Sequence, residues 1–79
     1  MHLTLIYTES NLLLSKKQYS SWREIQDEYS DYKTSLGPWS VGEVIEFLTE
    51  EYSNLNPSAR EQINNFVEDA AIIKTLGFA

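Results

Sequence analysis

Few residues in this sequence could carry out catalytic chemistry, and most of them are carboxylates. The chain has 79 residues, with one histidine and no cysteine. The histidine, His2, follows the first residue, where a frayed end is expected rather than a general base. A serine nucleophile needs a neighbouring base, and the many serines have no imidazole partner beyond His2. We therefore predict that the protein is not an enzyme and has no catalytic residue.

The acidic residues raise two further possibilities, glycoside hydrolysis and cation binding. A glycosidase needs one acid in a dry cleft near a second one, but the acids here fall on the expected solvent sides of helices, where raised pKa values are not expected. Asp27 and Asp31 have a helical i and i+4 spacing, yet "DEYSD" lacks the glycine and ligand spacing of an EF-hand loop. Without cysteine there is no thiolate zinc site, and three glycines form no phosphate-binding loop. We therefore expect no metal and no cofactor.

The most informative stretch is "EVIEFLTEEY", residues 43–52, which predicts a helix with one aromatic residue among its carboxylates. At 100° per residue, the apolar side chains share one side, and Phe47 falls between glutamates on the other. Phe47 is interpreted either as packing beneath a neighbouring element or as an exposed anchor for a partner inside a charged rim. The candidate partner-binding residues are Glu43, Glu46, Phe47, Glu50 and Glu51.

The charge distribution favours a protein partner with a basic surface. The net charge is −6, and residues 40–79 carry seven acids against two basic residues. Direct binding to DNA or to an anionic membrane needs a basic face, which this sequence lacks. We therefore predict a small acidic protein-binding module that acts as a regulator or inhibitor of a protein partner.

The alternative is a DNA mimic, a phage-type viral inhibitor of the anti-restriction or anti-CRISPR class. Four carboxylates between residues 43 and 51 follow one another about every 4 Å along a helix. This spacing is close to the roughly 3.4 Å between phosphates of one DNA strand. Such a helix could occupy a basic groove that normally receives nucleic acid.

The lack of cysteine favours a reducing compartment, because small secreted domains usually depend on disulfides. No apolar run approaches the roughly 18–20 residues of a membrane span, and the N-terminal sequence is not typical of a signal peptide. We therefore expect a cytoplasmic protein. The pattern leaves open whether it forms a homodimer.

An N-terminal β-hairpin and three helices are expected to position these residues. This is an α+β fold of order ββααα. We expect it to form a single domain over residues 1–79. "HLTLIYT" alternates in the manner of a strand, "ESN" is a turn signal and "LLLSK" follows. This pattern predicts a hairpin over about 2–17. Because an isolated hairpin is marginally stable in water, it must pack on the helices or on another chain.

Apolar spacing and capping residues predict helices over about 22–34, 41–54 and 58–76. Ser21 with Glu24 and Ser40 with Glu43 have the spacing of a capping box. In the first helix, apolar residues recur at intervals of three and four, and "SLGP" at 35–38 is expected to end it.

Trp39, just before Ser40, is expected to form a hydrophobic staple with Val44. The third helix starts either at Pro57, after Asn56, or after Ser58. Its end is predicted at Gly77, with Phe78 touching Ile73. The residues expected to be largely buried are Trp22, Tyr29, Trp39, Leu48 and Phe66.

Overall fold

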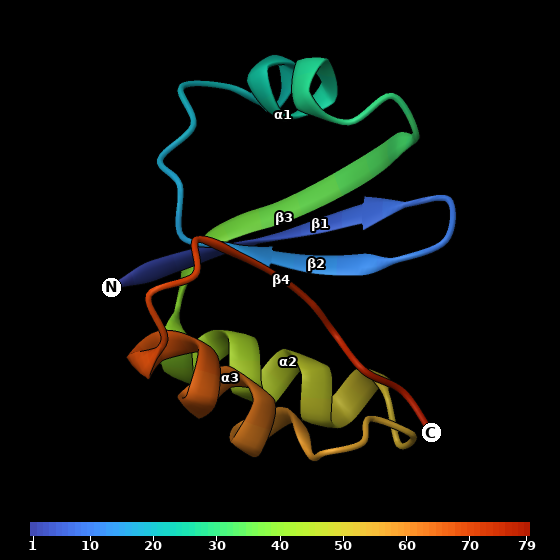
Figure 1. Ribbon diagram of the computed structural model, residues 1–79, viewed down its shortest axis with the longest axis vertical. Coiled ribbons are helices and arrows are strands. Elements are labelled where there is room, and N and C mark those ends of the chain that lie inside the picture. The colour runs from blue at the N-terminus through green and yellow to red at the C-terminus, as the bar shows by residue number, and fades with distance from the viewer.

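A four-stranded antiparallel sheet lies at the centre of the fold, with helices on both of its faces (Figure 1). The computed structural model describes residues 1–79. In chain order the elements are β1 (His2–Thr8), β2 (Leu12–Ser15), α1 (Trp22–Glu28), β3 (Tyr32–Ser40), α2 (Val41–Glu51), α3 (Ala59–Glu68) and β4 (Ile73–Thr75). The strands lie in the order β3-β1-β2-β4, so the two N-terminal strands occupy the middle of the sheet. No helix is long and apolar enough to cross a membrane.

The predicted hairpin is present, formed by β1 and β2. Tyr7 pairs with Leu12 next to the turn, and Thr4 pairs with Ser15 at the other end. The turn is held by Thr8, whose hydroxyl accepts a hydrogen bond from the Asn11 amide at 3.1 Å. Both faces of β1 are buried because helices cover the sheet on each side.

The main core lies between the sheet and the pair of helices α2 and α3. Its buried members are Leu3, Leu5, Leu12, Leu14, Val44, Leu48, Ala59, Ile63, Phe66 and Leu76. On the opposite face, a smaller cluster joins Ile6 and Leu13 to Ile25 of α1. Alternation along β1 explains the division, since Leu5 and Ile6 point to opposite faces of the sheet.

The predicted order ββααα is wrong, because the chain runs ββαβααβ. The helix expected over 22–34 ends at Glu28, and the residues expected to finish and cap it belong to β3. β3 pairs with the edge of β1 that β2 leaves free, with Leu36 opposite Leu5 and Trp39 opposite Leu3. Long-range strand pairing therefore overrides the helical spacing of the apolar residues.

Gly37 does not cap a helix but lies inside β3, at an irregularity in its pairing with β1. Its φ of +107° belongs to the region that favours glycine. A Cβ atom on Gly37 would lie 2.9 Å from the Leu3 carbonyl oxygen and 3.0 Å from the Trp39 nitrogen. The bend at this position carries the end of β3 toward the start of α2.

The second helix begins as predicted and ends at Glu51, three residues before the expected end at 54. The third, expected over 58–76, ends at Glu68, and residues 73–75 form β4 against β2. Phe78 does not close a helix on Ile73. It forms a bridge with Leu55 and packs edge-to-face on Tyr52, with ring centroids 5.5 Å apart.

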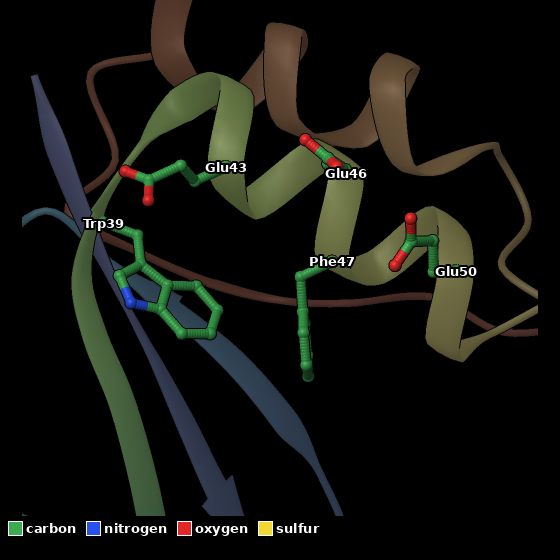
Figure 2. Close-up of a pocket in the computed structure, with 5 residues that line it drawn as sticks. All are labelled: Trp39, Glu43, Glu46, Phe47 and Glu50. Atoms are coloured by element: carbon green, nitrogen blue, oxygen red, sulfur yellow. The ribbon is translucent and has the colours of Figure 1, made fainter.

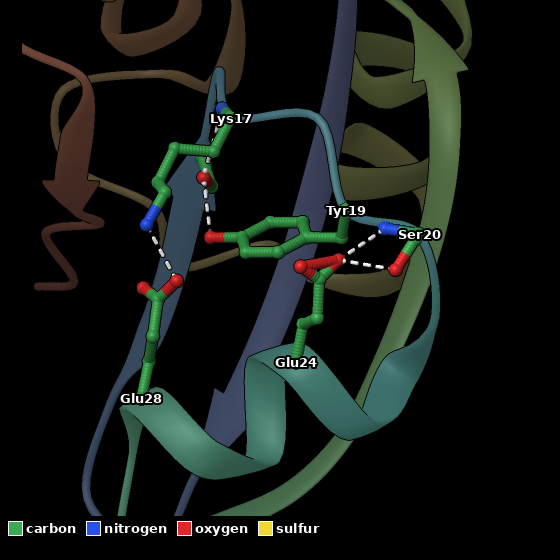
Figure 3. A network of polar contacts seen from close by, with 6 residues as sticks. Lys17, Tyr19, Ser20, Glu24 and Glu28 are labelled. Carbon is green, nitrogen blue, oxygen red and sulfur yellow. Dashed lines mark hydrogen bonds and ion pairs between the residues drawn. The ribbon is translucent and has the colours of Figure 1, made fainter.

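The capping predictions have different outcomes. The Ser40–Glu43 capping box is confirmed, with both reciprocal hydrogen bonds in place. Ser58 accepts from the Glu61 amide at 3.3 Å, so α3 starts after Ser58. The Ser21 side chain makes no cap hydrogen bond. Glu24 instead accepts from the Ser20 amide and hydroxyl (Figure 3).

Burial also differs from expectation at the first helix. Leu48 and Phe66 are buried as predicted, whereas Tyr29 and Trp39 are half-buried. Trp22 is 53 % exposed, so the prediction that it belongs to the core is wrong. The reason is the shortness of α1, which has seven residues and buries only Ile25.

Candidate functional site

Five side chains line a surface hollow where β3 runs directly into α2 (Figure 2). They are Trp39, Glu43, Glu46, Phe47 and Glu50, and the hollow has a volume of about 280 Å³. Trp39 comes from the end of β3, and the other four come from α2. We call this group of five residues the α2 hollow.

The sequence of α2 places the four helical residues on one stripe. Glu43, Glu46, Phe47 and Glu50 occupy positions i, i+3, i+4 and i+7, which are neighbours on a helix surface. The opposite stripe carries Val44 and Leu48, which are fully buried against the sheet. Burial of that apolar stripe therefore turns the acidic stripe outward.

The two aromatic residues of the α2 hollow contact each other. The ring centroids of Trp39 and Phe47 lie 5.2 Å apart at an interplanar angle of 62°, an edge-to-face arrangement. Both rings are half-buried and pack against the main core. Phe47 thus combines features of both interpretations, because its ring touches the core and also lines the hollow.

The three carboxylates of the hollow differ in how far they are engaged by the protein itself. Glu43 accepts a hydrogen bond from the Ser40 amide at 3.1 Å. This backbone hydrogen bond is the main cause that lowers the pKa of the Glu43 carboxyl, so it is ionised at neutral pH. Glu46 and Glu50 are exposed and make no hydrogen bond or ion pair within the chain. Two of the three carboxylates are therefore free to accept hydrogen bonds from another molecule.

The cations of the chain leave these carboxylates unpaired. The one ion pair joins Lys17 to Glu28, on the face of the sheet covered by α1 (Figure 3). Arg60 of α3 lines a neighbouring hollow together with Glu46 and Glu50, but it forms no ion pair with either. Charge in the α2 hollow is thus not neutralised by the fold.

Glu51 is the one predicted site residue that does not line the hollow. It is exposed, and its charge acts on Tyr7. Burial is the main cause that raises the pKa of Tyr7, whose hydroxyl lies 3.1 Å from the Tyr52 hydroxyl in a hydrogen bond. The structure therefore brings four of the five predicted residues together and sets Glu51 beside the two tyrosines.

Sequence reasoning missed Trp39 as a site residue, because it assigned this side chain to a staple with Val44. The available signal was its place directly before the N-cap residue Ser40, from which a large ring can reach along the first turns of the helix. In the structure the ring meets Phe47.

Other constellations that the sequence raised do not assemble. His2 is exposed at the start of β1, and no group of three His, Asp or Glu side chains is arranged to hold a metal ion. Comparison with protein-family models, with curated proteins and with solved structures found no match to this chain.

Proposed function

We propose that this protein is a non-enzymatic binding module that regulates or inhibits a protein partner with a basic surface, and that the α2 hollow is its binding site. The observation that carries the proposal is the pair of half-buried rings, Trp39 and Phe47, bordered by three carboxylates that no cation of the chain neutralises. Aromatic anchors inside a polar rim are typical of protein–protein interfaces.

Electrostatics support a basic partner. The chain has a net charge of −6, and exposed charges of one sign raise the association rate with an oppositely charged surface. Glu46 and Glu50 have no partner within the chain, so docking against lysines or arginines does not require breaking an existing ion pair.

The DNA-mimic alternative makes different demands on the same helix. Mimicry relies on the row of charges alone, whereas the hollow also contains Trp39 and Phe47 and leaves Glu51 outside it. We therefore favour the anchored interface, and mimicry is distinguished by its strong salt dependence and by competition with duplex DNA.

The test is capture of partners from the source cell by three immobilised proteins. One is the wild type, one carries Glu46→Gln and Glu50→Gln, and one carries Asp27→Asn and Glu68→Gln. The last two have the same net charge, but Asp27 lies on α1 and Glu68 at the end of α3, away from the hollow. We expect a partner that is retained by the wild type and the control and is lost by the hollow variant.

Equal retention by the hollow variant and the control would refute the assignment of the site. For a purified partner, affinity that falls about 10³-fold or more between about 0.05 and 0.2 M salt, together with displacement by duplex DNA, would favour mimicry. Weaker salt dependence without displacement supports the anchored interface.

A further inference from the structure

The lining of the α2 hollow is complementary to a narrow class of chemical groups. Its side chains offer three carboxylates, which accept hydrogen bonds only, and the two aromatic rings of Trp39 and Phe47. An anion would be repelled, and a neutral apolar group would leave the carboxylates without partners. The best complement is a cation that has several hydrogen-bond donors and an apolar stem.

The hollow is an open depression at the protein surface, with a volume of about 280 Å³. A long side chain that projects from a partner surface can reach both of its rings and the carboxylates at its border.

Cations already lie over aromatic rings elsewhere in this protein. Lys16 Nζ is 4.5 Å from the centroid of the Phe66 ring, and Arg23 lies over the ring of Trp22. The rings of Trp39 and Phe47 have no such neighbour, although carboxylates surround them. The position that a cation would occupy is thus left open on this face of the chain.

Arginine satisfies this environment better than lysine. Its planar guanidinium stacks on an aromatic face while its N–H groups, which lie in the same plane, donate to carboxylates at the rim. Glu46 and Glu50 lie one helical turn apart on the same helix as Phe47, and each carboxylate can accept hydrogen bonds from a guanidinium. The ammonium of lysine is a compact and strongly hydrated charge that does not stack.

We infer that the α2 hollow binds an arginine side chain of the basic partner, with the guanidinium against Trp39 and Phe47 and its N–H groups donating to Glu46 and Glu50. The inference rests on the proposed function, since that function supplies the partner. The preference for arginine belongs to the hollow itself and can be measured without the partner.

The experiment is a titration with three capped tripeptides that differ in the central residue, which is arginine, lysine or citrulline. Citrulline has nearly the shape of arginine but no charge. The readout is the amide ¹H–¹⁵N spectrum, with the indole N–H of Trp39, a residue that lines the hollow, as the side-chain reporter. We expect the arginine peptide to shift this signal and the amides of residues 43–50, with a dissociation constant in the millimolar range. Lysine should bind at least threefold more weakly, and citrulline should give no saturable shift.

Variants locate the binding. Glu46→Gln with Glu50→Gln should weaken arginine binding about tenfold, whereas Asp27→Asn with Glu68→Gln should change it less than twofold. Phe47→Leu keeps an apolar side chain at this position and should also weaken binding, because it removes a ring from the stack. Circular dichroism checks that each variant is folded.

Three results would overturn the inference: no shift at Trp39 with the arginine peptide, equal affinity for arginine and lysine, or equal loss of affinity in both charge variants. The proposed function can fail separately. If a partner is captured through Glu46 and Glu50 but the peptide titration fails, the interface stands and the arginine anchor does not. If the arginine peptide binds but no captured partner depends on Glu46 and Glu50, the preference of the hollow for arginine stands and the proposed partner interface does not.

Discussion

Gln62 and Gly77 are joined by a reciprocal pair of hydrogen bonds. The Gly77 amide donates to Gln62 Oε1 at 2.8 Å, and Gln62 Nε2 donates to the Gly77 carbonyl at 2.9 Å. Gln62 Nε2 also donates to the Pro57 carbonyl at 2.6 Å. The buried Gln62 side chain on α3 therefore hydrogen-bonds to the backbone of the segment that follows β4, as a peptide group of a neighbouring strand would.

The first prediction concerns this side chain. Gln62→Ala removes the partners of three backbone groups, so we expect a loss of about 2–4 kcal/mol in the free energy of unfolding. Urea denaturation measures the change. Gln26→Ala, at an exposed position on α1, is the control and should change stability by less than about 0.5 kcal/mol. A loss of less than about 1 kcal/mol for Gln62→Ala would show that the segment is not held by these bonds.

The second prediction concerns the bend in β3. Gly37→Ala places a Cβ against the Leu3 carbonyl at a positive φ, and we expect it to cost about 1–3 kcal/mol. Gly42→Ala, within α2, meets no atom within 4 Å and should stabilise the protein by about 0.4–1 kcal/mol. Thermal melts of the two variants should therefore shift in opposite directions. Shifts in the same direction would count against the described backbone at Gly37.

The third prediction separates core from hollow along α2. Leu48 is fully buried, and Leu48→Ala should cost about 2–5 kcal/mol. Phe47 is half-buried, so Phe47→Ala should cost about 1–3 kcal/mol, less than the roughly 3–5 kcal/mol of a fully buried phenylalanine. Chemical denaturation gives both values. A cost for Phe47→Ala as large as that for Leu48→Ala would mean that the ring belongs to the core alone.

The fourth prediction concerns pH. A hydrogen bond from the Ser40 amide lowers the pKa of Glu43 in the folded state, and the charge of His2 adds a smaller effect in the same direction. Its contribution to stability is therefore present above the unfolded pKa and is lost as the pH falls through the folded value. We expect Glu43→Ala to be less stable than the wild type at pH 7, and we expect this difference to shrink as the pH falls below the ordinary pKa of a glutamate. A difference that is constant over this range would contradict the assigned role of the carboxylate.

The fifth prediction concerns Arg60, a cation beside the site. Arg60 shares a neighbouring hollow with Glu46 and Glu50 without pairing to them. Arg60→Gln should therefore make the potential at the α2 hollow more negative and should raise the association rate of the arginine peptide or of a basic partner at low salt. Lys33→Gln, at an exposed position on β3, is the control with the same change in charge. Equal effects of the two variants would point to net charge rather than to the hollow.

Local signals in the sequence were enough to predict part of the fold. The alternation of "HLTLIYT" and the turn after it predicted the hairpin, and Ser40 with Glu43 located the start of α2. These features depend on residues close together in the chain. β3 and β4 were missed because their partners are remote: Leu36 pairs with Leu5, and Lys74 pairs with Leu14.

The same distinction applies to the candidate site. Four of its members lie within eight residues of one helix, so their grouping followed from helical spacing. Trp39 could not be added in this way, because its position depends on β3 ending where α2 begins, with Ser40 serving both elements. Trp39, predicted as a staple for Val44, is in fact held in β3 by pairing with Leu3.

The irregularity at Gly37 also bears on self-association. β3 is the outer strand of the sheet and is nine residues long, and a long regular edge can template the addition of strands from other molecules. Gly37 bends this edge, Pro38 has no N–H to donate, and Lys33 would bury its charge if another strand paired beside it. The bend that brings Trp39 to α2 thus also protects the open side of the sheet against aggregation.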